Sequence, residues 1–225
     1  MTRSAPAWWR TIDPSSPATI ELADELEQAI GRQLTLVRPA AADLNASGAW
    51  RSEDWTTAIP DADANAWLNA NLPDWIASDP DLPSWPDSIR TLQARFMNGI
   101  IQVGVAIRRG ERTLYLSASV RPHVDDAGAL WLPATRVHIG RLPIPASIML
   151  RHADESLEPL VPPELRDDAS ALVRLFRGID PVPNPVIRLG DGRQVRLLRV
   201  VPRNRRLIVT CRTESALPPR ADSDR

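Results

Sequence analysis

Apolar and polar residues alternate through a series of short segments between residues 89 and 145. A period of two is typical of β-strands that bury one face. Asn98-Gly99 and Arg109-Gly110 separate successive segments with residues that accept tight hairpin turns. Connections this short join antiparallel neighbours. The pattern therefore predicts four antiparallel strands, near 92–96, 101–107, 114–120 and 130–139.

The strand pattern returns near the end of the chain. Segments 186–189, 195–201 and 207–212 are rich in Val, Ile and Leu, and turn residues separate them at Asp191-Gly192 and near Asn204. These segments predict up to three more strands. A further strand is expected near 50–59, well before the first alternating region.

Helical periodicity occupies most of the remaining chain. Apolar residues recur at a period near 3.6 across 17–34, after serines that can cap a helix. Residues 60–63 begin a second helical pattern, which carries the apolar stripe Trp67, Leu68 and Leu72. Two more helices are predicted at 146–157 and at 163–178.

These elements define a fold class. Strands with one apolar face need helices or a second sheet to cover that face. We therefore predict an α+β fold, with an antiparallel β-meander of six to eight strands packed by about four helices. Residues 17–213 are expected to form a single domain, preceded by a flexible arm at 1–16 and followed by a disordered tail at 214–225.

The composition indicates a globular protein, but it does not indicate a particular activity. Of the 225 residues, 43% are hydrophobic and 24% are charged, which is ordinary for a globular domain. The net charge of -1 gives no global attraction for nucleic acid, so we expect no nucleic-acid partner. No apolar run is long enough to span a membrane. If residue 1 is the true start, the chain is expected to be cytoplasmic.

The search for catalytic and metal-binding motifs is negative. The single cysteine, Cys211, excludes a disulfide within the chain and any cysteine-based zinc site. His123 precedes Asp125-Asp126, but a predicted hairpin loop favours turn hydrogen bonds over metal binding. The pair Asp167-Asp168 falls at a predicted helix start, where negative charge is stabilising. We expect no enzymatic activity, metal or cofactor.

Two groups of residues leave functional alternatives open. Arg203, Arg205 and Arg206 form a basic cluster at a predicted hairpin turn, which suits either a phosphate or lipid headgroup or simple solvation. Eight tryptophans occur beside one tyrosine and two phenylalanines. Tryptophan suits core packing, but it also suits a ligand groove or a membrane interface, because indole has one apolar and one polar side.

The segment Ile59-Pro60-Asp61-Ala62-Asp63-Ala64-Asn65-Ala66-Trp67-Leu68, the meander after it, and Gly140-Arg141-Leu142-Pro143-Ile144-Pro145 carry a family resemblance. Residues 56–213 resemble the YpmS-like family of membrane-anchored bacterial proteins of unknown function. The resemblance implies a transmembrane anchor followed by a domain outside the cytoplasm. We expect either that such an anchor precedes residue 1 or that this member is soluble.

The leading functional hypothesis is a non-enzymatic, envelope-associated domain that holds a lipid or another hydrophobic ligand between a curved sheet and its helices. The ligand would be buried in a mostly apolar cavity with few polar anchors. The alternative is a structural or protein-interaction module in which the same face is a filled core. The predicted lining residues are Trp67, Leu68, Leu72, Trp75, Val103, Val105, Leu114 and Leu116.

Overall fold

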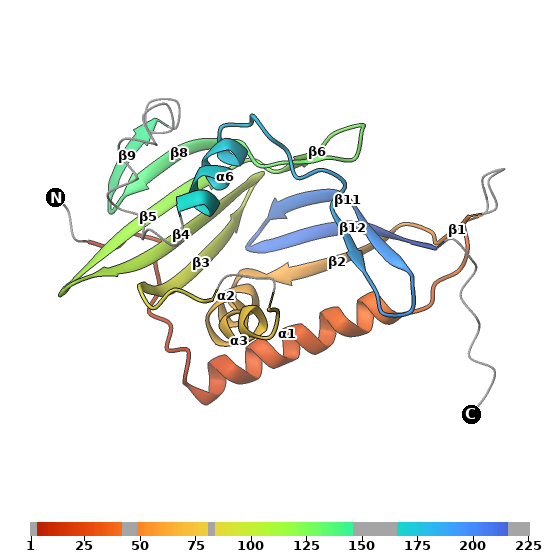
Figure 1. Ribbon diagram of the computed structural model, residues 1–225, viewed down its shortest axis with the longest axis horizontal. Helices are drawn as coiled ribbons and strands as arrows, with labels where there is room; N and C mark the ends of the chain where they lie inside the picture. Colours follow the sequence, from red (N-terminus) through yellow and green to blue (C-terminus); the bar gives the residue numbers. More distant parts are fainter. Residues whose placement is uncertain (1–3, 42–48, 81–83, 146–165, 216–225) are drawn as a thin grey trace.

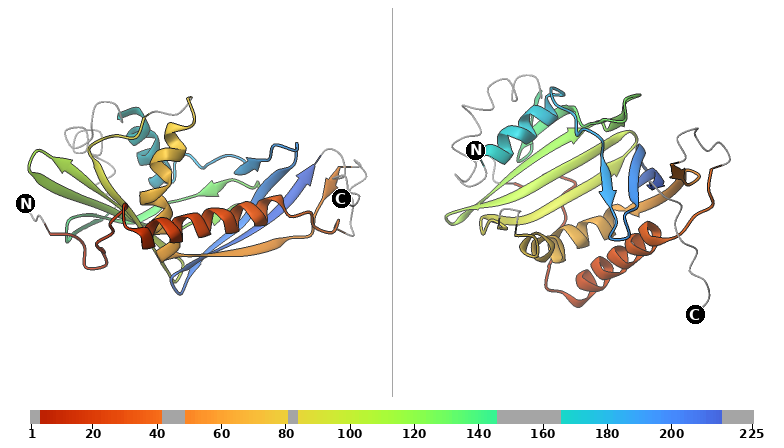
Figure 2. Two further views of the ribbon diagram at one scale, coloured as in Figure 1. Left: turned by 90° about the horizontal axis from the view of Figure 1, so that it is seen from below. Right: turned by 45° about the vertical axis from the view of Figure 1, so that its right-hand side comes forward.

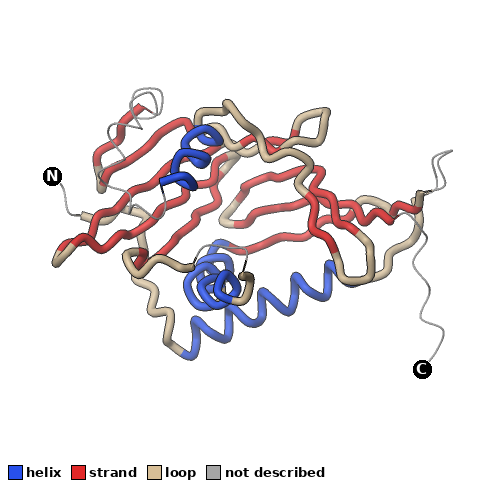
Figure 3. Tube along the Cα trace, in the orientation of Figure 1, coloured by secondary structure: helices blue, strands red, loops and turns tan. Residues whose placement is uncertain are grey.

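The computed structural model describes residues 4–41, 49–80, 84–145 and 166–215 of the chain. Two five-stranded antiparallel sheets lie side by side along the long axis of the molecule (Figure 1). The described helices lie over the first sheet and along the second (Figure 3). The predicted α+β class with an antiparallel meander is therefore confirmed, and its strands are divided between two sheets.

The first sheet is a meander from one continuous part of the chain. Its strands follow in the order β3 (Ile89–Met97), β4 (Ile100–Arg109), β5 (Arg112–Val120), β8 (Ala134–Ile139) and β9 (Leu142–Pro145). Gly99 and Gly110 adopt positive φ angles at its hairpins, as the turn signals predict, and Gly140 does the same at a hairpin that was not predicted. Between β5 and β8, β6 (His123–Val124) and β7 (Leu130–Trp131) form a small two-stranded ribbon.

The second sheet combines segments from both ends of the domain. The hairpin of β11 (Gln194–Arg203) and β12 (Arg206–Ser215) forms its centre, with β10 (Val186–Arg188) beside β11. On the other side of β12 lie β1 (Trp50–Arg51) and β2 (Trp55–Pro60), which precede the whole first sheet in sequence. Long-range pairing of this kind has no local sequence signal.

Three of the helices form one group. Helix α1 (Pro17–Thr35) begins after Ser16, whose side chain accepts a hydrogen bond from the Thr19 amide, and it runs along the second sheet (Figure 2). Helices α2 (Asp61–Ala70) and α3 (Leu72–Ala77) follow β2, and α2 packs against the amino-terminal half of α1. Ala23 and Leu26 of α1 are buried, consistent with this packing.

The fourth described helix, α6 (Arg166–Phe176), covers the first sheet. Its Val173 packs with Ala118, Val120 and Val137, and this cluster is extended by partly buried residues that include Val103 and Phe176. The helix predicted at 163–178 is thus present in its described part. The helix predicted at 146–157 lies outside the described residues.

Two asparagines of α2 bind the free edge of β3. The Asn65 side chain donates to the Ala94 carbonyl at 2.8 Å and accepts from the Ala94 amide at 2.6 Å. One helical turn later, Asn69 donates to the Leu92 carbonyl at 2.7 Å and accepts from the Leu92 amide at 3.0 Å. Four residues of helix advance about 6 Å and two residues of strand about 6.6 Å, so the spacings match.

The two sheets meet at their hairpin tips. The Gly99 amide donates to the Pro202 carbonyl at 2.9 Å, and the Arg205 amide donates to the Phe96 carbonyl at 3.0 Å. Arg205 also pairs with Asp61 in the first turn of α2 at 2.9 Å. The tip of the β11–β12 hairpin is therefore bound both to the first sheet and to α2.

The N-terminal arm, residues 4–16, lies on the face of the first sheet opposite α6. Gln93 is buried and binds the arm through both functions of its amide, accepting from the Arg10 amide at 3.0 Å and donating to the Arg10 carbonyl at 2.5 Å. The Trp9 ring meets Tyr115 edge to face at 5.2 Å. A Cβ atom added to Gly104 would lie 2.6 Å from the Trp9 ring, so glycine allows this close packing.

Replacing Asn65 with alanine should destabilise the domain strongly, because both backbone groups of Ala94 would lose their partners in a buried setting. We expect a loss of about 2–4 kcal/mol in the free energy of unfolding, measured by urea denaturation. Asn71→Ala is the matched control, since Asn71 forms exposed hydrogen bonds with Asp24 and Glu27. Equal losses in the two variants would contradict a special role for the edge contact.

Gly104→Ala should release the N-terminal arm while leaving the domain folded, because the new methyl group would collide with Trp9. We expect faster trypsin cleavage after Arg10 and a red shift of tryptophan emission. Gly31→Ala is the control, since an added Cβ there meets no atom within 4 Å. Unchanged cleavage in Gly104→Ala would show that the arm is held by other contacts.

Candidate functional site

An apolar groove, here called the α1 groove, lies between α1 and the second sheet. Its volume is about 340 Å³, which falls at the lower end of the range for ligand pockets. Helix α1 and strands β2, β10, β11 and β12 all contribute side chains. The lining residues are Ile30, Gln33, Leu34, Trp55, Thr57, Ile59, Pro185, Val186, Ile187, Val195, Leu197, Val209 and Cys211.

Strand register explains why this face of the second sheet is apolar. Val209 pairs with Thr57, and Cys211 pairs with Trp55 on one side and Leu197 on the other. Directly paired residues of neighbouring strands point to the same face. The alternating apolar positions of β2, β11 and β12 therefore form one continuous floor beneath α1.

Helix α1 is held above this floor by an arginine at its carboxyl end. Arg193 is 5% exposed and donates to the carbonyls of Thr35 at 2.9 Å and Leu36 at 3.4 Å. These carbonyls have no partner within the helix, and a cation is favoured there. Asp191 accepts from the same guanidinium at 2.7 Å. The groove thus lies under a helix that is fastened at both ends, by α2 and by Arg193.

A polar group borders the groove on the side of Trp55. The Arg38 guanidinium lies 3.8 Å from the centre of the Trp55 ring, a cation–π arrangement. It also donates to the Gln33 side chain at 2.9 Å. Burial lowers the pKa of Arg38, although arginine keeps its charge near neutral pH. The site consequently combines an apolar interior with one fixed positive charge beside two lining residues.

Cys211 lies on the floor of the groove and is 7% exposed. Burial raises the pKa of its thiol to about 11, which keeps the group protonated and unreactive near neutral pH. This side chain acts as a small apolar lining group, and it offers a chemical probe of the site.

The structure does not gather the eight predicted lining residues into this groove. Val103 packs in the cluster under α6, and Val105 pairs with Leu116 on the same face of the first sheet. Leu114 pairs with Ile107 further along those strands. The four helical residues, Trp67, Leu68, Leu72 and Trp75, lie on α2 and α3.

The two predicted tryptophans lie at the corner between the helices. Trp67 and Trp75 are 6.4 Å apart between ring centres, and Trp67 donates to Glu27 of α1 at 3.0 Å. Trp75 is 53% exposed, and Leu68 and Leu72 are half-buried. None of the eight lines the α1 groove.

The sequence contained part of the signal for the residues that line the α1 groove. Ile30 and Leu34 belong to the recognised helical stripe, and Val209 and Cys211 belong to a recognised strand. The missing information was the pairing of β2 with β12, which brings Trp55 to the same face. That pairing joins segments about 150 residues apart, so local periodicity cannot reveal it.

A second, polar cavity of about 240 Å³ lies between the N-terminal arm and the start of α2. Its lining includes Trp8, Asp61, Gln93 and Arg95. Asp61 is already paired with Arg205, and Gln93 with the backbone of Arg10. This cavity therefore belongs to the contact between the N-terminal arm and the rest of the domain.

The histidine and aspartate residues considered for metal binding have other contacts. Asp125 accepts hydrogen bonds from the Trp131 indole and the Ala129 amide, each at 2.8 Å, and these bonds lower the pKa of Asp125. The His123 ring is stacked on Trp131. In the described ranges, no group of three or more His, Cys, Asp and Glu side chains is placed to hold a metal ion.

Comparisons with known proteins add no family assignment. No protein-family model matches the chain, and neither the curated proteins nor the solved structures contain a matching chain. Among the described residues, no helix is both long and apolar enough to cross a membrane. The membrane anchor implied by the resemblance of residues 56–213 stays a prediction.

The Cys211 thiol should react slowly with iodoacetamide in the folded protein. A pKa near 11 instead of the ordinary value of 9.0 reduces the thiolate fraction at pH 8 by about 100-fold, and burial hinders access as well. We expect alkylation, followed by mass spectrometry, to be at least that much slower in buffer than in 8 M urea, taken as roughly the strength needed to unfold a small domain. Similar rates would contradict the buried position.

Proposed function

We propose that this protein binds a small hydrophobic or amphipathic molecule, such as a short acyl chain, in the α1 groove. The observation that carries the proposal is an open groove of about 340 Å³ whose lining is almost entirely aliphatic or aromatic. Burial of apolar ligand surface supplies the affinity, at roughly 25 cal/mol per Å². The groove lies between a sheet and a helix, as in the leading hypothesis. The sheet involved is the second one, whereas the predicted lining strands belong to the first.

The polar groups beside the groove favour a ligand with an acidic end. Arg38 and Gln33 form the polar side next to Trp55, and the rest of the lining offers few polar atoms. A carboxylate accepts two parallel hydrogen bonds from a guanidinium, which adds orientation to apolar burial. A fatty acid of modest length fits both features.

The alternative, a structural or protein-interaction module with a filled core, is favoured by one observation on the first sheet. There Val173 of α6 forms a buried cluster with Ala118 and Val137, and Val103 and Phe176 pack against this cluster, where a ligand had been expected. A filled face on the first sheet and an open groove on the second are compatible, because different helices cover them.

Calorimetric titration with dodecanoic acid tests the proposal. We expect binding by the unaltered protein and at least a tenfold weaker affinity in Leu197→Trp, since the larger ring would fill the groove. Leu142→Trp is the matched control, because Leu142 is 56% exposed on the first sheet. Arg38→Gln should weaken binding of dodecanoic acid more than binding of 1-dodecanol, which lacks the carboxylate.

The same titration separates the two candidate functions. Equal affinity in Leu197→Trp and the unaltered protein would place any ligand elsewhere. No binding of either dodecanoic acid or 1-dodecanol would favour the filled module instead. Placement in the cell envelope is part of the proposal only through the family resemblance, and localisation of the full-length protein in cell fractions tests it separately.

A further inference from the structure

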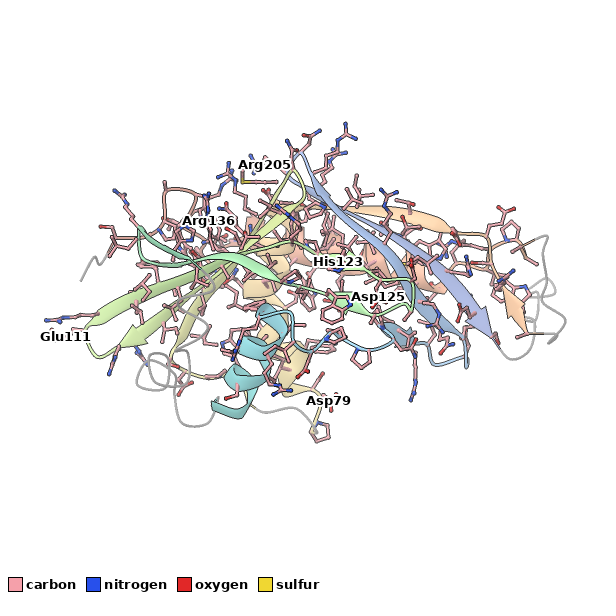
Figure 4. All side chains as sticks on the ribbon, turned by 90° about the horizontal axis from the view of Figure 1, so that it is seen from above. Asp79, Glu111, His123, Asp125, Arg136 and Arg205 are labelled. Carbon is pink, nitrogen blue, oxygen red and sulfur yellow. The ribbon has the colours of Figure 1, made fainter. Side chains whose placement is uncertain are left out.

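A row of polar side chains crosses the face of the first sheet that α6 does not cover. Arg95 of β3 pairs with Gln102 of β4, Gln102 pairs with Ser119 of β5, and Ser119 pairs with Arg136 of β8. These four residues, here called the Arg95 row, therefore project from one face along a line across four strands. Figure 4 shows Arg136 on the side of the molecule opposite α6, and Arg205 lies on that same side.

The geometry of the row suits one small anion between its two ends. Neighbouring strands are about 4.8 Å apart, so the two arginine Cα atoms are separated by about 14 Å. Only Gln102 and the small Ser119 lie between them. Long side chains from both ends can incline over this interval and bring two guanidinium groups to a single tetrahedral anion.

The arginines at the two ends of the row form no ion pair within the described part of the chain. Neither Arg95 nor Arg136 has an ion-pair partner there, although five other arginines do: Arg174, Arg193, Arg196, Arg205 and Arg212. The neighbouring row of Gln93, Gly104, Ser117 and His138 also contains no acidic residue. Asp61 lines the same polar cavity as Arg95, but it is already paired with Arg205, so the two arginines of the row are available to an external anion.

Two polar atoms on this face of the first sheet are buried without a hydrogen-bond partner. They are the Gln102 side-chain oxygen and the Ser117 hydroxyl. Ser117 is 6% exposed and lies in the neighbouring row. A half-turn of the Gln102 amide would present its N–H₂ group instead, and both groups would then donate toward the face. Unpartnered buried polar atoms are uncommon in folded proteins and call for a partner.

The pKa of His138 is affected by the same positive charge. Burial lowers the pKa of His138, and the Arg136 guanidinium lowers it further. The histidine lies next to Ser117 in the strand register. A bound anion near Arg136 would oppose the second effect, so this ring provides a local reporter.

We propose that the Arg95 row binds a phosphoryl group. Arg95 and Arg136 supply the charge, and Gln102 and Ser119 supply hydrogen bonds between them. Planar guanidinium groups bind phosphate oxygens in pairs, and two opposed arginines match a dianion better than a monoanionic carboxylate. The N-terminal arm borders the site, since Trp8 and Trp9 pack on Gly104 in the adjacent row. The site belongs to the first sheet and is independent of the α1 groove.

Titration of the full chain with inorganic phosphate, followed by NMR of the histidine rings, tests the proposal. We expect saturable shifts of the His138 resonances and a rise in the pKa of His138. A His138→Gln variant assigns the signals among the three histidines. Arg95→Gln/Arg136→Gln should weaken phosphate binding by at least tenfold. The matched control Arg112→Gln/Arg188→Gln also removes two arginine charges, from exposed positions outside the row.

Flotation with vesicles that contain phosphatidic acid, whose phosphate is a monoester, compared with phosphatidylcholine vesicles, identifies the source of the phosphoryl group. Phosphate binding without flotation points to a soluble phosphorylated ligand, and flotation that Arg95→Gln/Arg136→Gln abolishes points to a lipid headgroup. Either result supports the site. The proposal is overturned if neither probe binds, or if Arg95→Gln/Arg136→Gln binds both probes as the control does. Circular dichroism of each variant establishes that it is folded.

Discussion

The paired hydrogen bonds of Asn65 and Asn69 with the edge of β3 are the contact on which the rest of the molecule depends. A free strand edge presents backbone groups that need partners, and two side-chain amides supply them here. They fix α2 along the first sheet. Helix α1 packs on α2, so its position over the second sheet, and with it the α1 groove, follows from this edge contact.

The two surfaces proposed to bind ligands differ in the physical interaction that each offers. The α1 groove is apolar because three strands contribute alternate residues to one face, while a helix fastened at its ends does not fill the space. The Arg95 row is polar because the opposite face of the first sheet receives only the N-terminal arm. In the α1 groove a ligand would be held by burial of apolar area, and at the Arg95 row it would be held by positive charge.

Local patterns predicted the elements well, but the lining residues they suggested do not line the α1 groove. The turns at Gly99 and Gly110, the helix that begins after Ser16, and the Pro60–Asp61 helix start all follow from residue preferences within a few positions. The predicted lining residues were chosen on the assumption of one sheet. Val103 instead lies under α6, and the groove formed where β2 pairs with β12. Asn65 belongs to the segment that carries the family resemblance. Its hydrogen-bond partner, Ala94, is 29 residues away, so the local sequence does not reveal the contact.

By itself, the sequence determined the α+β class, the antiparallel meander and most helix and turn positions, because hydrophobic period and turn chemistry act over short distances. Only the tertiary structure decided how the strands divide between two sheets, which apolar face is filled and which stays open, and that Arg95 and Arg136 share a face. These outcomes depend on pairing between distant segments, and no residue carries that information in its own neighbourhood.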